Sequence, residues 1–178
     1  MMPVGPLMIE HRLIEKMLKR MLVEVDRIEK EKKVDVRFIE LAVDFIRTYA
    51  DRCHHGKEED ILFRELKKKK LSPEHERTMN ELVQEHIFAR GEVKKLVAAK
   101  DLYVQGQKEK TGEIVAQLRK LADFYPKHIK KEDKGFFIPV MDYFSRVEQD
   151  AMIAEGNEFD RKLIHEKYRK MVKELSEQ

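Results

Sequence analysis

Apolar residues recur at intervals of three and four along most of the chain, and polar residues separate them. This spacing puts the apolar side chains on one face of an α-helix. A first stretch begins at Ile9 and ends near Ile28, where the polar segment EKEKKVD interrupts the pattern. A second stretch runs from Phe38 to Leu62 and ends at a run of lysines. We therefore expect one long amphipathic helix from each stretch.

Two further helices are expected in the middle of the chain. Ser72 followed by Pro73 is a helix-start signal, because serine accepts hydrogen bonds from free backbone amides and proline is tolerated in the first turn. The helix that starts there should end before the turn around Gly106. A fourth apolar stretch begins at Ile114, and Pro139 marks its end or a kink.

Beyond Ser145 the spacing is helical again and predicts an appended helix on the outside of the bundle. Its apolar residues are Phe159, Leu163, Ile164, Tyr168, Met171, Val172 and Leu175. Short polar connections between four helices favour antiparallel neighbours. We therefore predict an all-α protein with an up-down-up-down four-helix bundle and an appended C-terminal helix. One domain should span residues 1–178, with the bundle at about 7–142 and the extension at about 145–177.

Composition and charge exclude several classes of protein. The 178 residues include 37 Lys and Arg against 34 Asp and Glu, and the two signs are interspersed, so no basic face for nucleic acid is expected. Cys53 is the single cysteine, which excludes an intramolecular disulfide and fits a reducing compartment. No apolar run is long enough to span a membrane and no export signal is evident. We expect a cytoplasmic protein that binds neither nucleic acid nor a membrane.

A short internal repeat carries the candidate chemistry. The segment HHGKEEDILF begins at His54, and HIKKEDKGFF begins at His128. Each has the pattern His-x-x-x-Glu, which places Glu58 and Glu132 one helical turn after their histidines and on the same helix face. The apolar register of each helix directs that face into the core. The repeat therefore predicts two buried pairs of imidazole and carboxylate.

The other two bundle helices each add one core-facing histidine. His11 lies three residues before Ile14, and His86 lies three after Val83. One buried histidine is usually a hydrogen-bonded structural residue, but four histidines and two carboxylates on converging helices would each need a buried partner. Burying an unpaired carboxylate costs several kcal/mol, a penalty that a bound cation removes. Imidazole and carboxylate without thiolate favour iron, manganese or zinc, and two glutamates able to bridge favour two ions.

Four ordered motifs resemble the hemerythrin-like domain, also called the HHE cation-binding domain. They are EHRLIEKML, CHHGKEEDILF, QEHIFARGEV and HIKKEDKGFF, and the resemblance extends from His11 to about Phe137. It implies a four-helix bundle with a non-haem centre of two iron ions, in proteins that carry or sense dioxygen, handle nitric oxide or respond to iron. Carried over to the matching positions, the implied ligands are His11, His54, Glu58, His86, His128 and Glu132.

The chain departs from the oxygen-carrying members of that family in two places. Arg90 stands four residues after His86, where those proteins have a second histidine, and a guanidinium cannot bind a metal. Their fourth helix closes with an aspartate five residues after its histidine, whereas here Glu132 follows His128 by four. The missing histidine weakens reversible carriage of dioxygen but does not weaken metal binding.

His55 is the candidate to replace the missing histidine, since it lies about 100° around the helix from His54 and near the edge of the core. The alternative is a histidine outside the ligand set. Glu59 is expected to be a solvated charge. Cys53, Tyr49 and Tyr125 are expected to serve packing, with control of access to the centre or supply of an electron as the alternative. His75 is expected to be structural or solvated. His165, on the appended helix, is expected to be structural or solvated, and Glu155 and Glu158 could reach an open metal position.

Three functions of different classes remain open from the sequence. The first is a metal-binding carrier or sensor of dioxygen, nitric oxide or peroxide. The second is a di-iron enzyme that reduces nitric oxide or peroxide, or oxidises iron. The third is a structural helical module. The chain has no Gly-rich dinucleotide or phosphate-binding motif, so no organic cofactor is expected. The sequence does not indicate a redox or signalling partner.

Overall fold

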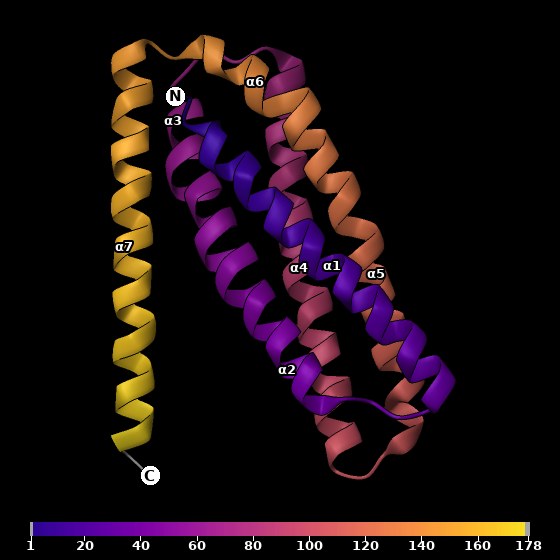
Figure 1. Ribbon diagram of the computed structural model, residues 1–178. Coiled ribbons are helices and arrows are strands. Elements are labelled where there is room, and N and C mark those ends of the chain that lie inside the picture. The colour runs from indigo at the N-terminus through magenta and orange to yellow at the C-terminus, as the bar shows by residue number, and fades with distance from the viewer. Residues whose placement is uncertain (1, 177–178) are drawn as a thin grey trace.

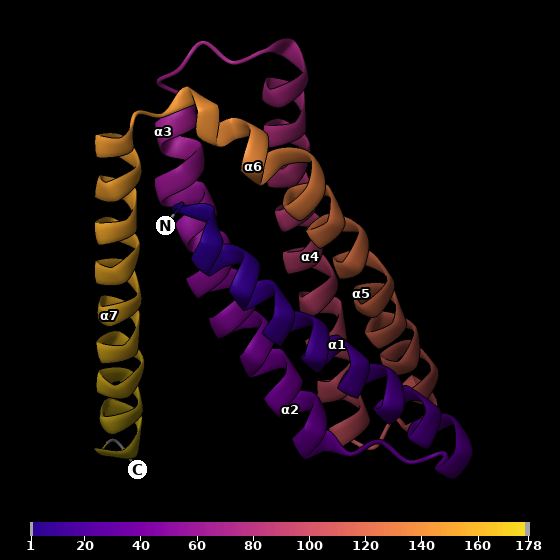
Figure 2. The same cartoon turned by 45° about the horizontal axis from the view of Figure 1, so that its top comes forward.

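A computed structural model of the protein describes residues 2–176 and the side chains of residues 2–163. The described chain is helical and contains no strand, which confirms the all-α prediction. The longer helices among the described residues are α1 (Val4–Glu31), α2 (Val36–Phe45), α4 (Pro73–Val104), α5 (Thr111–Lys131) and α7 (Arg146–Ser176). In Figures 1 and 2, α1, α2, α4 and α5 lie side by side, and α7 lies alongside them.

Shorter helical segments continue or connect these helices. Three are π-helical, with hydrogen bonds to the fifth residue along the chain, and lie at η1 (Ile46–His55), η2 (Glu58–Phe63) and η4 (Glu132–Phe136). The others are α3 (Arg64–Leu66), η3 (Lys108–Lys110), α6 (Phe137–Val140) and η5 (Met141–Tyr143).

The π-helical segments correct the prediction of a plain α-helix over 38–62. The helical path runs through this region, but α2 gives way to η1 at Ile46, and η2 leads into α3. A π-helix places about one more residue in each turn, so successive side chains rotate less about the axis. This change alters the direction of His54 and His55, and both are buried. The sequence pattern predicted helix but not this local widening.

Helix ends follow ordinary capping chemistry. The Ser72 hydroxyl accepts a hydrogen bond from the His75 amide at 3.2 Å, which confirms the predicted start of α4. The Asp35 carboxylate accepts from the Phe38 amide at 3.1 Å at the start of α2. α1 ends at Lys32, whose φ of 54° is left-handed and stops the helix. The last four residues of the polar segment EKEKKVD, 32–35, are therefore the connection between α1 and α2, and its first three residues end α1.

Two apolar clusters fill the bundle, and a polar layer separates them. One cluster includes Ile14 and Leu18 of α1, and the other includes Val4 and Leu7 of the same helix. His11 lies between these two sets, and the other helices repeat the arrangement. The seven buried polar residues predicted as ligands thus lie in a layer enclosed by apolar side chains on both sides.

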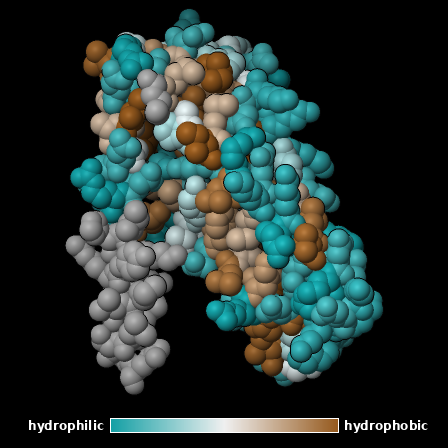
Figure 3. Space-filling view, viewed as in Figure 1, coloured by the Kyte–Doolittle hydropathy of each residue, from teal (hydrophilic) through white to brown (hydrophobic). Residues whose placement is uncertain are grey.

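Some residues of the expected apolar faces are exposed. Ile9, Leu13 and Leu22 of α1 expose 69%, 44% and 40% of their surface, and Ile87 of α4 exposes 52%. The buried face of α1 instead includes Leu7 and His11. A helix buries only one stripe, so apolar residues beside that stripe remain at the surface. Figure 3 shows hydrophobic patches on a face of the molecule that is otherwise mostly hydrophilic.

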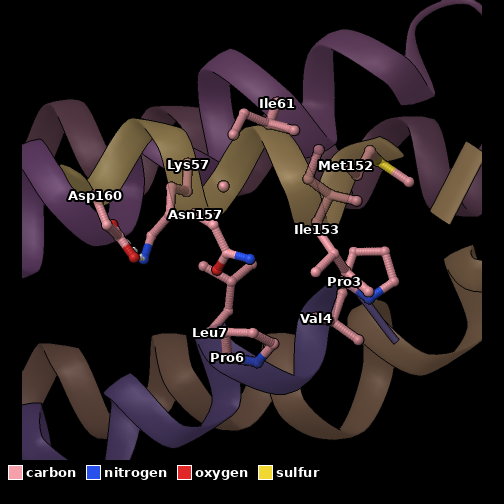
Figure 4. Close-up of a pocket in the computed structure, with 12 residues that line it drawn as sticks. Pro3, Val4, Pro6, Leu7, Lys57, Ile61, Met152, Ile153, Asn157 and Asp160 are labelled. Carbon is pink, nitrogen blue, oxygen red and sulfur yellow. Dashed lines mark hydrogen bonds and ion pairs between the residues drawn. The ribbon is translucent and has the colours of Figure 1, made fainter. Parts of the chain in front are cut away.

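α7 packs against η1 and η2. Met152 is buried, and Phe159 packs against the cluster that includes Val4. Lys57 forms an ion pair with Asp160 of α7 at 2.9 Å. Figure 4 shows a small pocket where α7 faces α1, with Lys57 and Asp160 at one end.

The remaining residues predicted for the buried face of α7 lie outside the described side chains: Ile164, Tyr168, Met171, Val172 and Leu175, together with His165. Among the described residues, no helix is long and apolar enough to cross a membrane.

Candidate metal centre

The structure brings seven predicted residues together in the polar layer. Each exposes no more than 2% of its surface. They are His11, His54, His55, Glu58, His86, His128 and Glu132. His11 comes from α1, His86 from α4 and His128 from α5, and the others come from the π-helical segments. Four separate parts of the chain therefore supply polar atoms to one enclosed volume.

Four of these residues form a group that we call the His11 site: His11, His54, Glu58 and Glu132. Each offers a ligand atom within 4.8 Å of the others. The Nε2 atoms of His11 and His54 lie 2.8 Å apart. Two nitrogens that each lie about 2.1 Å from one metal ion, in adjacent coordination positions, are about 3 Å apart. The spacing therefore fits two ligands of the same ion.

The second group, which we call the His55 site, contains His55, Glu58, His86 and His128. Its ligand atoms also lie within 4.8 Å of one another. The rings of His55 and His86 stack with their centroids 3.9 Å apart and their planes 11° apart. The structure thus places His55 beside two residues of the predicted ligand set. His55 is therefore one of the residues that could hold a metal ion here.

Each glutamate divides its two oxygens between the two sites. Glu58 Oε1 lies 3.1 Å from His54 Nε2, and Oε2 lies 3.3 Å from His86 Nε2. Glu132 Oε2 lies 3.2 Å from His11 Nε2, and Oε1 lies 3.2 Å from His128 Nε2. A carboxylate oriented in this way can bind one ion with each oxygen. The geometry therefore fits two bridging glutamates between two cations.

Four outer carboxylates orient the histidines from the other side of each ring. The Nδ1 atom lies 2.7–2.9 Å from an outer carboxylate oxygen in four pairs: His11 with Asp133, His54 with Glu10, His86 with Glu59, and His128 with Glu85. An ionised carboxylate only accepts hydrogen bonds, so each Nδ1 donates its proton outward. This contact fixes the ring orientation and directs Nε2 into the centre, as in metal sites with a carboxylate behind each histidine.

These outer carboxylates were not predicted, although the sequence contains a signal for them. Each is the immediate neighbour of an inner residue: Glu10 precedes His11, Glu59 follows Glu58, Glu85 precedes His86, and Asp133 follows Glu132. Each, however, contacts a histidine of the next helix. The carboxylate on α1 contacts the histidine on η1, and the one on η2 contacts the histidine on α4. The carboxylate on α4 contacts the histidine on α5, and the one on η4 contacts the histidine on α1. The prediction that Glu59 is a solvated charge was wrong for this reason.

Arg90 lies outside the layer of ligand atoms. Its Nε donates to Asp51 Oδ1 and its Nη2 donates to Glu59 Oε1, each at 2.7 Å. Glu59 also contacts His86, and Asp51 lies 3.4 Å from His55 Nδ1. Arg90 therefore holds the two carboxylates that stand behind two histidines of the His55 site.

Burial and charge shift the pKa values of the inner residues in different directions. Burial alone would lower the pKa of His54, but the carboxylates of Glu58 and Glu10 raise it to about 10. Glu132 and Glu85 likewise raise the pKa of His128 to about 10 against the effect of burial. The carboxylate beside His55, Asp51, is paired with Arg90, and burial together with neighbouring imidazoles lowers the pKa of His55 well below 6.5. Without a metal, the centre therefore favours protons on His54 and His128 and a neutral His55.

The inner polar atoms test whether a cation fits. Among the described residues, both oxygens of Glu58, both of Glu132, and the Nε2 atoms of His86 and His128 make no hydrogen bond. When Nδ1 donates outward, the Nε2 of a neutral imidazole carries a lone pair and faces carboxylate oxygens that also only accept. Such an arrangement is unfavourable unless cationic charge lies between the groups. A metal ion, or protons on the rings, would satisfy it.

The other sequence candidates lie away from these atoms. Cys53 contacts Asp160 through its sulfur at 3.2 Å, and burial raises its pKa to about 12, so it is a thiol at neutral pH. Glu155 pairs with Arg64 at 2.7 Å, and Glu158 pairs with Arg161 at 3.1 Å. Neither glutamate is in the centre.

His75 and the two tyrosines make packing or hydrogen-bond contacts with neighbouring side chains. His75 Nδ1 lies 2.9 Å from the Tyr143 hydroxyl, which gives it the predicted structural role. Tyr49 stacks on Phe45 with the ring centroids 5.1 Å apart, and Tyr125 is buried beside His128.

Comparison with known proteins gives one match. The sequence profile of the hemerythrin HHE cation-binding domain matches residues 2–138, which is more than half of the chain and includes every inner residue. No curated protein and no solved structure matches the chain.

Proposed function

The chain belongs to the hemerythrin HHE cation-binding family, and we propose that it holds two iron ions and reacts with or senses dioxygen, nitric oxide or peroxide. The observation that carries this proposal is the division of the Glu58 and Glu132 oxygens between two groups of histidines. Two bridging carboxylates serve two ions, as in other carboxylate centres of helical bundles. The proposed ligands are His11, His54, His55, Glu58, His86, His128 and Glu132.

Iron is the proposed metal because five imidazoles and two carboxylates form a set of nitrogen and oxygen ligands without thiolate. Manganese and zinc accept the same ligands and are the alternatives. When bound, the iron pair would supply binding positions and redox chemistry for the small oxidant. The nearest sulfur, Cys53, is turned toward Asp160 of α7 rather than toward the inner atoms.

The protein side chains prepare the centre in three ways. The outer carboxylates hold the rings with Nε2 inward, so no large rearrangement is needed when an ion binds. The Phe137 ring stacks on His11 with the centroids 5.7 Å apart, and the apolar clusters on both sides of the layer exclude bulk water. Glu58 and Glu132 balance the positive charge within this dry volume.

The two sites differ in the number of proposed ligands. The His55 site has three histidines in addition to the glutamates, whereas the His11 site has two. The ion of the His11 site would therefore have more open positions for a small ligand. An open position favours reaction with oxidants over protected, reversible carriage. Sensing or reaction thus fits the ligand set better than oxygen storage.

Three finer features belong to the same proposal. The first is the up-down-up-down order of the four bundle helices, which short connections between long helices support. The second is a single domain over residues 1–178 with the extension as part of it. The third is a cytoplasmic location, which the lone Cys53 supports, because disulfides are rare in that compartment.

Anaerobic reconstitution with iron tests the proposal. We expect about two irons per chain by elemental analysis and an optical spectrum that changes when the reduced protein meets air. Autoxidation within minutes would support a sensor, and repeated turnover with nitric oxide or peroxide would support the enzyme alternative. A complex that releases dioxygen under vacuum would contradict the preference against carriage. Absence of tightly bound metal would leave only the structural module.

A further inference from the structure

A pocket of about 320 Å³ lies next to the His55 site, between η1 and α4. His55 and Tyr125 line its inner part, and both are nearly fully buried. Among the described lining residues, Ile46, Ala89 and Val93 form an apolar wall. The pocket therefore joins the surface to the edge of the centre along a partly apolar path.

Positive charge dominates the polar part of this pocket. Four of the described lining residues are cationic, namely Arg47, Arg52, Arg90 and Lys94, and Asp51 is the one carboxylate among them. The protein as a whole is nearly balanced in charge, with a net charge of +3. A local excess of cations in a recess raises the local concentration of anions. The charge therefore favours an anionic occupant.

The Tyr125 hydroxyl supplies a second, independent indication of a ligand. Tyr125 is 1% exposed and contacts other rings, but its hydroxyl makes no hydrogen bond with any described residue. The hydroxyl is not one of the fully enclosed, unpaired atoms of the described residues, so it reaches the space of the pocket, where water or an occupant can accept its hydrogen bond. Tyr125 lines the pocket, so an occupant with an acceptor oxygen would satisfy it.

The guanidinium of Arg90 is oriented by two carboxylates and lines the same pocket. Its Nε and Nη2 donate to Asp51 and Glu59, which fixes the plane of the guanidinium. Its Nη1 makes no hydrogen bond with the described residues, and the side chain lines the pocket. A fixed guanidinium with free N–H donors suits a planar carboxylate better than a flexible ammonium does.

We propose that this pocket binds a small organic carboxylate. The carboxylate group would accept hydrogen bonds from Arg90 and Tyr125, and the apolar part of the molecule would lie against Ile46, Ala89 and Val93. The apolar wall and the volume favour an organic anion over an inorganic one, which would leave most of the space unfilled. The side chains of the protein form this pocket without any metal, so the inference can be tested separately from iron binding.

Calorimetric titration of the metal-free protein with hexanoate at pH 7 is the direct test. We expect affinity to increase from acetate to butanoate to hexanoate by about fourfold for each CH₂ group that is buried. Hexanol and hexylamine, which lack the carboxylate, should not bind. Equal binding of hexanoate and nitrate would show that charge alone is recognised and would overturn the proposal. Absence of hexanoate binding would do the same.

Two conservative variants test the contacts. Tyr125→Phe removes only the hydroxyl and should weaken hexanoate binding by about tenfold or more, as expected for a hydrogen bond to a charged group. Arg90→Lys should weaken it by a similar factor. Tyr49→Phe and Arg64→Lys remove matching groups outside the pocket and should bind like the wild type.

Thermal melting identifies a variant that fails to fold. Lys94→Gln, at the pocket rim, then replaces that variant in the test, and it should weaken hexanoate binding by about threefold. Wild-type affinity in both Tyr125→Phe and Arg90→Lys would refute the proposed contacts. If iron reconstitution fails while hexanoate binds as described, the proposed function fails and this inference stands.

Discussion

The His11 site and the His55 site share Glu58 but differ in ligands and in surroundings. The His11 site has two histidines and lies under a chain of contacts in which Asp160 of α7 binds Lys57, Lys57 binds Glu10, and Glu10 binds His54. The His55 site has three histidines and borders a pocket of about 320 Å³. The site with more proposed ligands is thus beside the pocket, and the site with fewer proposed ligands is covered by the contacts that lead to α7.

This difference indicates that ligand number and access are controlled separately. A pocket beside an ion with few ligands would admit any small molecule to it. Here the third histidine occupies the side that the pocket approaches, and α7 restricts the side that has fewer ligands. The comparison therefore predicts unequal effects for equivalent substitutions at the two sites.

The largest effect is expected where the two sites meet. Glu58→Gln removes the negative charge that both groups share while keeping the shape of the side chain. We expect the iron content after reconstitution to fall from about two per chain to less than about one, because each ion loses a bridging ligand. Elemental analysis measures the content. The exposed Glu40→Gln is the matched control and should retain full occupancy.

A result in which Glu58→Gln loses one iron and keeps the other at full occupancy would contradict the bridge. It would assign Glu58 to a single site and make the two sites independent.

The next largest effect separates the two sites. His55→Ala should remove one iron and leave the other, because His11 and His54 are unchanged. His11→Ala should do the converse. Elemental analysis together with the optical spectrum checks both variants, and His75→Ala controls for loss of a partly buried histidine that bonds to Tyr143. Unchanged iron in His55→Ala would place His55 outside the ligand set.

Much of the centre was predictable because its residues obey local rules. The repeat His-x-x-x-Glu identified His54 with Glu58 and His128 with Glu132 from spacing alone, since residues four apart share a helix face. The apolar register added His11 and His86. The structure brings all six together, and each exposes less than 3% of its surface. Family resemblance then supplied the expectation of iron.

The features that were not predicted from the sequence depend on contacts between helices. Glu10 is adjacent to His11 but bonds to His54, 44 residues away, and no spacing rule within one helix predicts such a contact. The direction of His55 depends on the π-helical turns of η1, whereas the prediction rested on ordinary α-helical rotation. Both errors arise where tertiary packing, rather than periodicity, decides the position of a side chain.

A smaller effect concerns the pH dependence of the metal-free protein. The pKa of His54 in the folded state is raised from 6.5 to about 10, so the stability it contributes is present below pH 6.5 and is lost as the pH rises toward 10. His55 has a lowered pKa and has the opposite dependence, with stability lost as the pH falls below 6.5. The two neighbouring histidines should therefore respond to pH in opposite ways.

Melting curves of the metal-free protein between pH 6.5 and 10 test this difference. The decrease in Tm over that range should be smaller in His54→Gln than in the wild type by about 5 °C or more, and His55→Gln should keep the wild-type decrease. Identical pH profiles of His54→Gln and the wild type would contradict the assigned charge. In the iron-loaded protein, Tm should instead fall as the pH is lowered, because acid protonates the ligands and releases the metal.

The smallest effect tests how closely α7 covers the His11 site. Gly56 has helical angles, with φ −58° and ψ −44°, so alanine fits its backbone. A Cβ atom there would lie 2.7 Å from Cζ of Phe159 on α7, whereas at Gly156 the nearest atom would be 3.9 Å away.

Alanine in a helix is more stable than glycine by about 0.5–1 kcal/mol. Gly156→Ala should show this gain in the free energy of unfolding, and Gly56→Ala should lose it or become destabilised by about 1 kcal/mol, because the Phe159 ring must move. Denaturant unfolding measures both. Removing the ring with Phe159→Ala should restore the gain from Gly56→Ala in the double variant, and equal gains at Gly56 and Gly156 in the wild-type background would show that α7 does not approach η1 this closely.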